Sequence, residues 1–179
     1  MAPEKQEKNP LYSELASELQ AMVDVDQEMR ERSEKEDNFW DHNIDRKNTE
    51  RMKEIITRYG FPTISMVGAE GMENAWLLIQ HADHDVDFQE NCLELMKKVA
   101  PDEIDRTRIA YLEDRVRVNR KMGQLYGTQF YQKDGKHIPQ TIEDENHVNE
   151  RRAQMGMGTL QDQIDSMYEK YGVPRDITT

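Results

Sequence analysis

The sequence predicts a mainly α-helical protein, an irregular bundle of several helices with one small β-hairpin at about residues 128–141. Two observations favour this fold class. Apolar residues recur at intervals of three and four along most of the chain, which is typical of amphipathic helices. Only the stretch around Asp134 and Gly135 combines a turn dipeptide with flanking residues that suit strands.

The first half of the chain is expected to be helical. The first helix follows a polar lead-in through Pro10 and carries Leu15, Leu19, Met22 and Met29 at helical spacing. The second carries Met52, Ile55, Ile56 and Tyr59 and is expected to stop at Gly60 and Pro62. Residues 63–67 are expected to form a short extended connector. The third helix is apolar almost all round from Ala75 to Ile79, which is typical of a central buried helix.

Two further helices precede the hairpin. The fourth carries the apolar stripe Phe88, Cys92, Met96 and Val99 and is expected to end before Pro101. We interpret Cys92 as a small core residue, because a lone cysteine cannot form an intramolecular disulfide. The fifth carries Ile109, Leu112 and Val116 and is expected to end at Gly123.

The hairpin is expected to pair residues 126–132 with residues 136–142. A two-residue Asp-Gly loop would place Tyr131 opposite Ile138 and Gln129 opposite Gln140. The last helix is predicted to begin with a capping box between Thr159 and Asp162.

The domain organisation is expected to be one compact unit. Residues 1–58 would form N-terminal helices that pack on or extend from the domain, residues 59–172 would form the helical domain with its hairpin, and residues 173–179 would fray.

Charge limits the classes of partner. The chain has 179 residues, with 36 acidic and 24 basic side chains and a net charge of −12, which repels nucleic acid and anionic lipid. No apolar run of about 18 residues is present, and Met1 to Lys8 is charged where a secretory signal is apolar. We therefore expect a cytoplasmic protein with no nucleic-acid or membrane partner. The oligomeric state cannot be predicted.

The leading candidate site is the run from Trp76 to Asp85, where an apolar helix ends in two histidines and two aspartates. Burying such groups without partners is costly. A buried carboxylate, Asp83 or Asp114, could orient His81 or His84 as a general base near neutral pH. The alternative is that the histidines only cap the helix and bond to nearby backbone.

A divalent metal is a second possibility for this run. His81 and His84 lie about 60° apart around a helix, a spacing that can serve one zinc or iron ion, and Asp85 could add a carboxylate ligand. No third ligand is obvious, so the cofactor remains unknown. The ligand positions of a calcium-binding EF-hand loop are matched in spacing by Asp83, Asp85, Asp87, Asn91 and Glu94. Phe88 stands where that loop needs glycine, which argues against calcium.

Polar residues in the second half of the chain are candidates for the same site. Asp114 and Arg115 interrupt apolar faces of the fifth helix, and a buried charge must be paired. A solvated charged face explains them equally well. Gly127 allows a close approach of the backbone, and its neighbours Tyr126, Thr128 and Gln129 suit recognition of a small molecule.

Several of these sequence motifs, taken together, resemble those of a known family. The segments Gln80-His81-Ala82-Asp83-His84-Asp85 and Gln124-Leu125-Tyr126-Gly127-Thr128-Gln129, with Asp114-Arg115 between them, are similar to a family of uncharacterised, mainly bacterial helical proteins. The resemblance covers about residues 59–171, with Val86 where many relatives have proline. The resemblance implies that these polar motifs contribute to one functional site. It therefore favours a functional role over helix capping for His81, Asp83, Arg115 and Gln129. No activity comes with the resemblance.

The leading hypothesis for function is a hydrolase or acid/base enzyme acting on a small anionic substrate. His81, Asp83 and Asp114 would be catalytic, and the substrate would be bound by Gln80, Arg115, Tyr126, Thr128 and Gln129. One alternative is a non-catalytic protein-interaction module with a structural histidine cluster. Another is a zinc or iron protein with His81, His84 and Asp85 as ligands.

Overall fold

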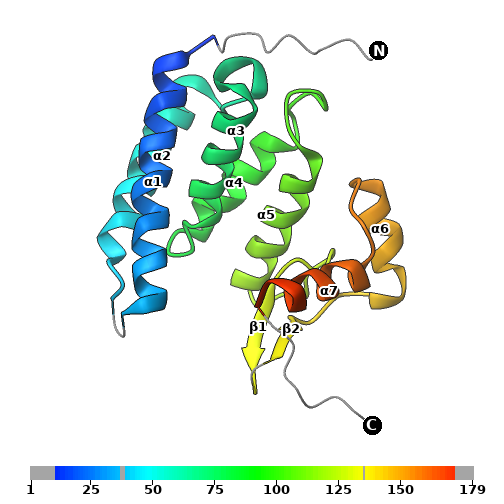
Figure 1. The fold of residues 1–179 in the computed structure, drawn as a ribbon. Helices are drawn as coiled ribbons and strands as arrows, with labels where there is room; N and C mark the ends of the chain where they lie inside the picture. The colour runs from blue at the N-terminus through cyan, green and yellow to red at the C-terminus, as the bar shows by residue number, and fades with distance from the viewer. Residues whose placement is uncertain (1–10, 37–38, 135, 172–179) are drawn as a thin grey trace, which may run out of the picture. The chain divides into compact units, whose positions relative to one another are not determined.

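The computed structural model describes residues 11–36, 39–134 and 136–171 (Figure 1). In these residues it contains seven α-helices and one two-stranded antiparallel hairpin, which confirms the predicted fold class. The chain divides into two compact units, the first ending at Asp105 and the second beginning at Arg106. None of the described helices is both long and apolar enough to cross a membrane.

The first unit contains α1 (Ser13–Lys35), α2 (His42–Tyr59), α3 (Ile64–Gln80) and α4 (Val86–Met96). The first three pack against one another, and α4 packs on α3 (Figure 1). The largest fully buried apolar side chains include Leu19 from α1, Met52 and Ile55 from α2, and Ile79 from α3. Each such side chain contributes about 2 kcal/mol of hydrophobic stabilisation. Cys92 is also fully buried, which confirms its prediction as a core residue.

The start of α3 corrects one prediction. Residues 64–67 form its first helical turn rather than an extended connector, and the break in the helix comes at Gly68, with φ +79° and ψ 168°. Glu103 stabilises this turn because its backbone oxygen accepts from Ile64 N at 3.0 Å and its carboxylate accepts from Ser65 N at 2.7 Å. The β-branched residues favoured an extended segment, but a partner almost 40 residues away in sequence satisfies the helix start.

The second unit contains α5 (Arg106–Asn119), β1 (Phe130–Lys133), β2 (Lys136–Pro139), α6 (Val148–Gln154) and α7 (Leu160–Tyr171). A single 3₁₀ turn, η1 (Glu145–His147), leads into α6. Helix α7 packs on β2 and on α6. The capping box at the start of α7 is confirmed, because Thr159 N donates to Asp162 and Asp162 N donates to the Thr159 hydroxyl.

The hairpin register is as predicted. Tyr131 pairs with Ile138, and Gln140 N donates to Gln129 O at 2.9 Å. The strands are shorter than the predicted ranges 126–132 and 136–142 because residues 124–129 form a separate turn on α5. Asp134 has the positive φ, +52°, that the expected turn requires. Gly135, the lead-in before Leu11 and the tail at 173–179 lie outside the described residues.

The end of α5 also differs from the prediction. The helix ends at Asn119, and the chain reverses at Lys121, which has φ +62°, before it reaches Gly123. Gly123 instead approaches the backbone of the segment after β2, where an added Cβ would lie 3.2 Å from Glu143 N. The glycine is therefore needed for close contact rather than for ending the helix.

Candidate functional site

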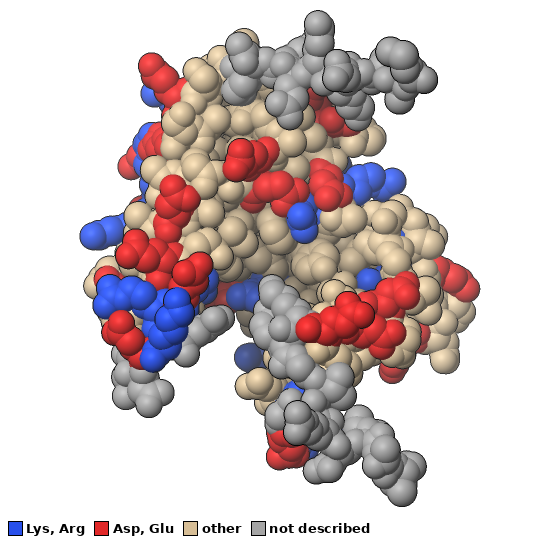
Figure 2. All heavy atoms as spheres, viewed as in Figure 1, with Lys and Arg blue, Asp and Glu red and all other residues tan. Residues whose placement is uncertain are grey.

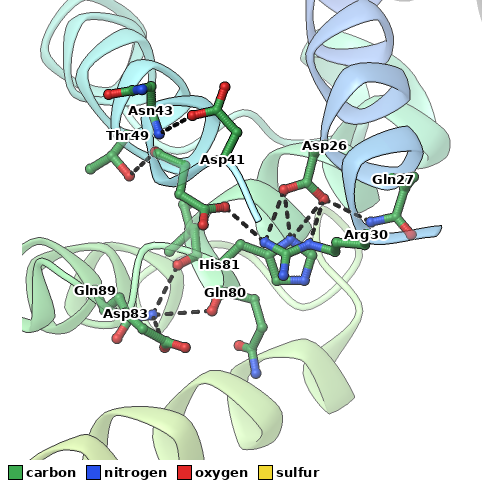
Figure 3. A network of polar contacts seen from close by, with 12 residues as sticks. Asp26, Gln27, Arg30, Asp41, Asn43, Thr49, Gln80, His81, Asp83 and Gln89 are labelled. Atoms are coloured by element: carbon green, nitrogen blue, oxygen red, sulfur yellow. Dashed lines mark hydrogen bonds and ion pairs between the residues drawn. The ribbon is translucent and has the colours of Figure 1, made fainter. Parts of the chain in front are cut away.

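His81 closes α3 and contacts a carboxylate from α1. Its Nδ1 lies 2.9 Å from Asp26 Oδ2 and 3.1 Å from Asp26 Oδ1 (Figure 3). The side chain of His81 is 16% exposed, and no described residue hydrogen-bonds its Nε2. One nitrogen of the imidazole is thus held by the protein, while the other is available to solvent or a ligand.

Asp26 is the buried anion of this cluster. Only 1% of its side-chain surface is exposed. Burial on its own would raise the pKa of Asp26, but hydrogen bonds from His81 and Arg30, together with their charges, lower that pKa to about 2. Gln27 Nε2 adds a further hydrogen bond at 2.7 Å. Asp26 is therefore ionised at neutral pH.

Arg30 joins Asp26 to a second carboxylate, that of Asp45 on α2. Its Nε and one terminal nitrogen each lie 3.1 Å from an oxygen of Asp26, and the same terminal nitrogen donates to Asp45 at 2.8 Å. The indole ring of Trp40 lies over the guanidinium, 4.9 Å from its carbon to the ring centroid. Burial raises the pKa of Asp45, although the charge of Arg30 opposes that shift.

Gln89 on α4 closes the end of α3 beside His81. Its fully buried amide nitrogen lies 3.1 Å from Ile79 O, 3.2 Å from Gln80 O and 3.2 Å from Asp83 Oδ1 (Figure 3). Gln80 O is a carbonyl group that the helix leaves without an intrahelical partner, whereas Ile79 O also accepts from Ala82 N at 3.1 Å. Asp83 thus contacts the residue that caps the helix.

Gln80 is 6% exposed, and its side-chain oxygen is buried with no hydrogen-bond partner among the described residues. Figure 3 shows its side chain directed away from Asp26. His84 is exposed in the turn after α3. Asp85 caps α4 by accepting from Phe88 N at 3.0 Å, and it pairs with Lys53 at 2.9 Å.

No group of three or more His, Cys, Asp and Glu side chains among the described residues is placed to hold a metal ion. The set His81, His84 and Asp85 is therefore not assembled as a ligand set in this structure. The imidazole nitrogen of His81 nearest a carboxylate bonds Asp26, and both oxygens of Asp85 have partners of their own.

In the second unit, Asp114 on α5 holds the turn that leads to the hairpin. The Asp114 carboxylate accepts from the backbone N–H groups of Leu125, Tyr126 and Thr128 and from the Thr128 hydroxyl, at 2.6 to 3.2 Å. Burial raises the pKa of Asp114, and these hydrogen bonds oppose the shift. Asp114 is fully buried, so the alternative of a solvated charged face does not apply to it.

Two glutamines hold the same turn in place. Gln124 is fully buried and accepts from Gln129 N at 2.8 Å, while its amide nitrogen donates to the backbone oxygens of Gln129 and Gln140. Gln129 accepts from Arg115 at 3.1 Å and donates to the Thr128 hydroxyl at 3.0 Å. Asp114 and Arg115 on α5 therefore both contact the turn at residues 124–129 within this unit.

The other side of the turn contacts α6 and α7. Arg152, 2% exposed, donates to Tyr126 O and Gly158 O, each at 2.6 Å. An added Cβ on Gly127, which has φ +72°, would lie 2.5 Å from Leu160 Cδ1. This confirms that Gly127 permits a close approach. Tyr126 reaches Glu113 through its hydroxyl, at 3.3 Å.

The predicted site residues therefore fall into two groups. Gln80, His81, Asp83, His84 and Asp85 belong to the first unit, whereas Asp114, Arg115, Tyr126, Thr128 and Gln129 belong to the second. Within its own unit each group is connected by the contacts above. Convergence of the two groups on one pocket, with Arg115 holding an anionic group, stays a prediction.

Asp26 is the residue that the sequence analysis does not single out. A signal for it exists, because Asp26 follows Met22 by four residues and precedes Met29 by three, which places it on the apolar side of α1. A carboxylate on such a face needs a buried partner. The same reasoning that selected Asp114 could have selected Asp26.

A family model matches most of the chain. Residues 13–175 match the family described as "Family of unknown function (DUF6624)". No significant match was found among the curated proteins or among the solved structures. The family region begins at α1, so it includes Asp26 and extends beyond the range 59–171 that the motifs alone indicated. The chain belongs to the DUF6624 family, whose function is unknown.

Proposed function

We propose that this protein is an acid/base enzyme acting on a small substrate, with His81 as the general base and Asp26 as its positioning residue. The observation that carries the proposal is the hydrogen bond between Nδ1 of His81 and the buried carboxylate of Asp26. A carboxylate bonded at Nδ1 favours the tautomer that has its proton there and a lone pair on Nε2. That nitrogen is the one without a partner among the described residues.

The proton would move in two steps. Nε2 of His81 takes a proton from a water molecule as the water oxygen attacks the substrate, while the proton on Nδ1 stays on that nitrogen and remains hydrogen-bonded to the ionised carboxylate of Asp26. The ionised Asp26 stabilises the imidazolium, which then gives the proton to the leaving group. Hydrolysis of a small ester is the least demanding reaction of this kind, because water is the only other reactant. A small anionic ester is the substrate class we favour.

The test is hydrolysis of three chromogenic esters: p-nitrophenyl phosphate, p-nitrophenyl sulfate and p-nitrophenyl acetate. His81→Ala is expected to lower the rate on at least one of them by about 100-fold or more. The matched control is His147→Ala. His147 has the same Nδ1 contact with a carboxylate, 2.9 Å from Asp144, but both side chains are more than half exposed. That variant should keep the wild-type rate.

The proposal fails if the wild-type protein hydrolyses none of the three esters faster than His81→Ala does. Circular dichroism of both variants shows whether each has folded. Asp26→Asn is the second variant, since it keeps the size of the side chain but removes the charge that stabilises the imidazolium. It should lower the rate as well, by about 10-fold or more.

A non-catalytic protein-interaction module is the competing function, and one observation favours it. The Arg30 guanidinium bonds carboxylates on both α1 and α2, so the cluster also serves to hold these helices together. In that case His81→Ala would lower the free energy of unfolding without changing ester hydrolysis.

We also propose that the protein acts in the cytoplasm and that nucleic acid is not its partner. The single cysteine is a buried thiol, which suits a reducing compartment. On the face drawn in Figure 2, the Lys and Arg side chains at the lower left lie beside Asp and Glu side chains. The net charge of −12 repels a phosphate backbone.

A further inference from the structure

We infer that Asp45 and Arg30 are positioning residues that set how readily His81 takes up a proton, and this inference rests on the proposed role of His81 as a base. Neither residue reaches the imidazole directly in the contacts described above. Arg30 hydrogen-bonds the carboxylate of Asp26, to which His81 also bonds, and the charge of Asp45 interacts with that of His81 without a hydrogen bond between them.

The carboxylate of Asp26 is oriented by Arg30. Arg30 bonds both oxygens of Asp26, so it fixes the plane of the carboxylate against which Nδ1 of His81 lies. Such a two-point contact orients a carboxylate more strictly than a single bond does. Asp45 in turn holds Arg30 from α2 at 2.8 Å. The imidazole is thus oriented by a chain of ion pairs that runs through two helices.

The charges of Asp26, Arg30 and Asp45 also affect the proton on His81. Asp26 and Asp45 supply two negative charges and Arg30 supplies one positive charge, so the three together carry a net charge of −1. A neutral His81 leaves this charge uncompensated, whereas an imidazolium cancels it. Asp45 therefore neutralises Arg30 and leaves the charge of Asp26 available to stabilise a proton on His81.

Other charged groups near the cluster are the same in every variant compared, so they do not change the expected differences between variants. Lys53 on α2 pairs with Asp85, at the start of α4, and with Glu50 on its own helix. Asp83 follows α3 and contacts Gln89, and His84 in the same turn is the other titratable imidazole that interacts electrostatically with Asp45. His84→Gln can be combined with every variant below to remove its titration.

The experiment is a titration of the His81 imidazole in the full-length protein, without substrate, followed by the NMR chemical shift of its Cε1 proton. Asp45→Asn leaves Arg30 uncompensated and is expected to lower the midpoint pH of the His81 titration by about 1 unit relative to wild type. Arg30→Gln removes the competing cation and is expected to raise the midpoint by about 1 unit. The double variant should return close to the wild-type midpoint.

Asp41→Asn is the matched control. It removes one negative charge from the exposed N-cap of α2, and asparagine can keep the cap that Asp41 forms with Asn43 N. It should leave the midpoint unchanged. If Arg30→Gln does not fold, Asp45→Asn and Asp41→Asn decide the question alone.

Shifts of opposite sign in the two single variants support the inference, because a merely structural role would not predict opposite directions. Shifts of the same sign, or an unchanged midpoint in Asp45→Asn, overturn it. The titration reads His81 without turnover, so its outcome is independent of ester hydrolysis. If ester hydrolysis depends on His81 but the midpoints of the His81 titration are the same in all variants, the proposed function is supported and the positioning roles of Asp45 and Arg30 are contradicted.

Discussion

Thr128 donates two hydrogen bonds to Asp114, one from its backbone N–H at 3.0 Å and one from its hydroxyl at 2.9 Å. Leu125 and Tyr126 donate to the same carboxylate. A carboxylate with its oxygens occupied in this way organises the turn around itself, which supports a structural role for Asp114. The stability of the second unit should therefore depend on this side chain.

Asp114→Ala should lower the free energy of unfolding by about 3 kcal/mol or more, because it leaves several buried N–H groups without an acceptor. Urea denaturation measures the loss. Asp165→Ala, on the exposed side of α7, is the control and should change the free energy by less than about 0.5 kcal/mol. Equal losses in the two variants would contradict the role of Asp114.

The pH dependence of stability should show the contribution of Asp26. A carboxyl whose pKa falls from 3.8 to about 2 on folding stabilises the folded state by about 2 kcal/mol at neutral pH. That contribution is present above pH 3.8 and is lost as the pH falls through about 2. Urea unfolding at several pH values between 5 and 2 measures it.

Asp26→Asn should be less stable than wild type at neutral pH, and its stability should fall less between pH 4 and pH 2. Asp24→Asn, an exposed aspartate on the same helix, should retain the wild-type fall. An Asp26→Asn protein with the full wild-type loss over this range would show that Asp26 does not carry it.

Gln89→Leu should weaken the end of α3. The substitution keeps a side chain of similar size but removes the donor that the carbonyls of Ile79 and Gln80 share, at a cost of about 1–3 kcal/mol. Hydrogen exchange of the amides in the last turn of α3 should accelerate more than exchange in α1. Gln161→Leu on the exposed side of α7 is the control, and no change in α3 is expected from it.

Gly127→Ala and Gly156→Ala separate steric overlap from backbone strain. Both glycines have positive φ, +72° and +76°, so each alanine should cost about 1 kcal/mol from its backbone conformation. Only at Gly127 would the new Cβ overlap a neighbour, Leu160 Cδ1 at 2.5 Å. Its total loss should be about 2–3 kcal/mol, and Leu160→Ala should make the added loss smaller. Equal losses at the two glycines would rule out the overlap.

Local patterns predicted much of the fold. The helical spacing of apolar residues predicted α1 to α5 and α7, the Asp-Gly dipeptide predicted the hairpin register, and Thr159 with Asp162 predicted the start of α7, whereas the short helix α6 was not predicted. These features depend on residues close together in sequence, where the geometry follows from the spacing. The first turn of α3 was mispredicted because Glu103, which satisfies its backbone, lies far along the chain.

The candidate site was predicted only in part. His81 was selected because a polar group at the end of a buried helix needs a partner. The partner was not found, since Asp26 lies 55 residues away and nothing in the spacing joins the two. The family resemblance assigned Arg115 and Gln129 to the same site, and their side chains do contact each other. Long-range pairs such as Asp26 and His81 depend on how helices pack, which periodicity alone does not specify.

The sequence separations of these contacts bear on the order in which the chain folds. Thr128 lies 14 residues from Asp114, whereas His81 lies 55 residues from Asp26. Closing a short loop costs less chain entropy than closing a long one, and folds with local contacts form faster. The second unit can therefore nucleate around the Asp114 carboxylate as soon as α5 and its turn are made. The bond between His81 and Asp26 requires α1 to pack on α3 and closes a longer loop, so we expect it to form later than the turn on Asp114.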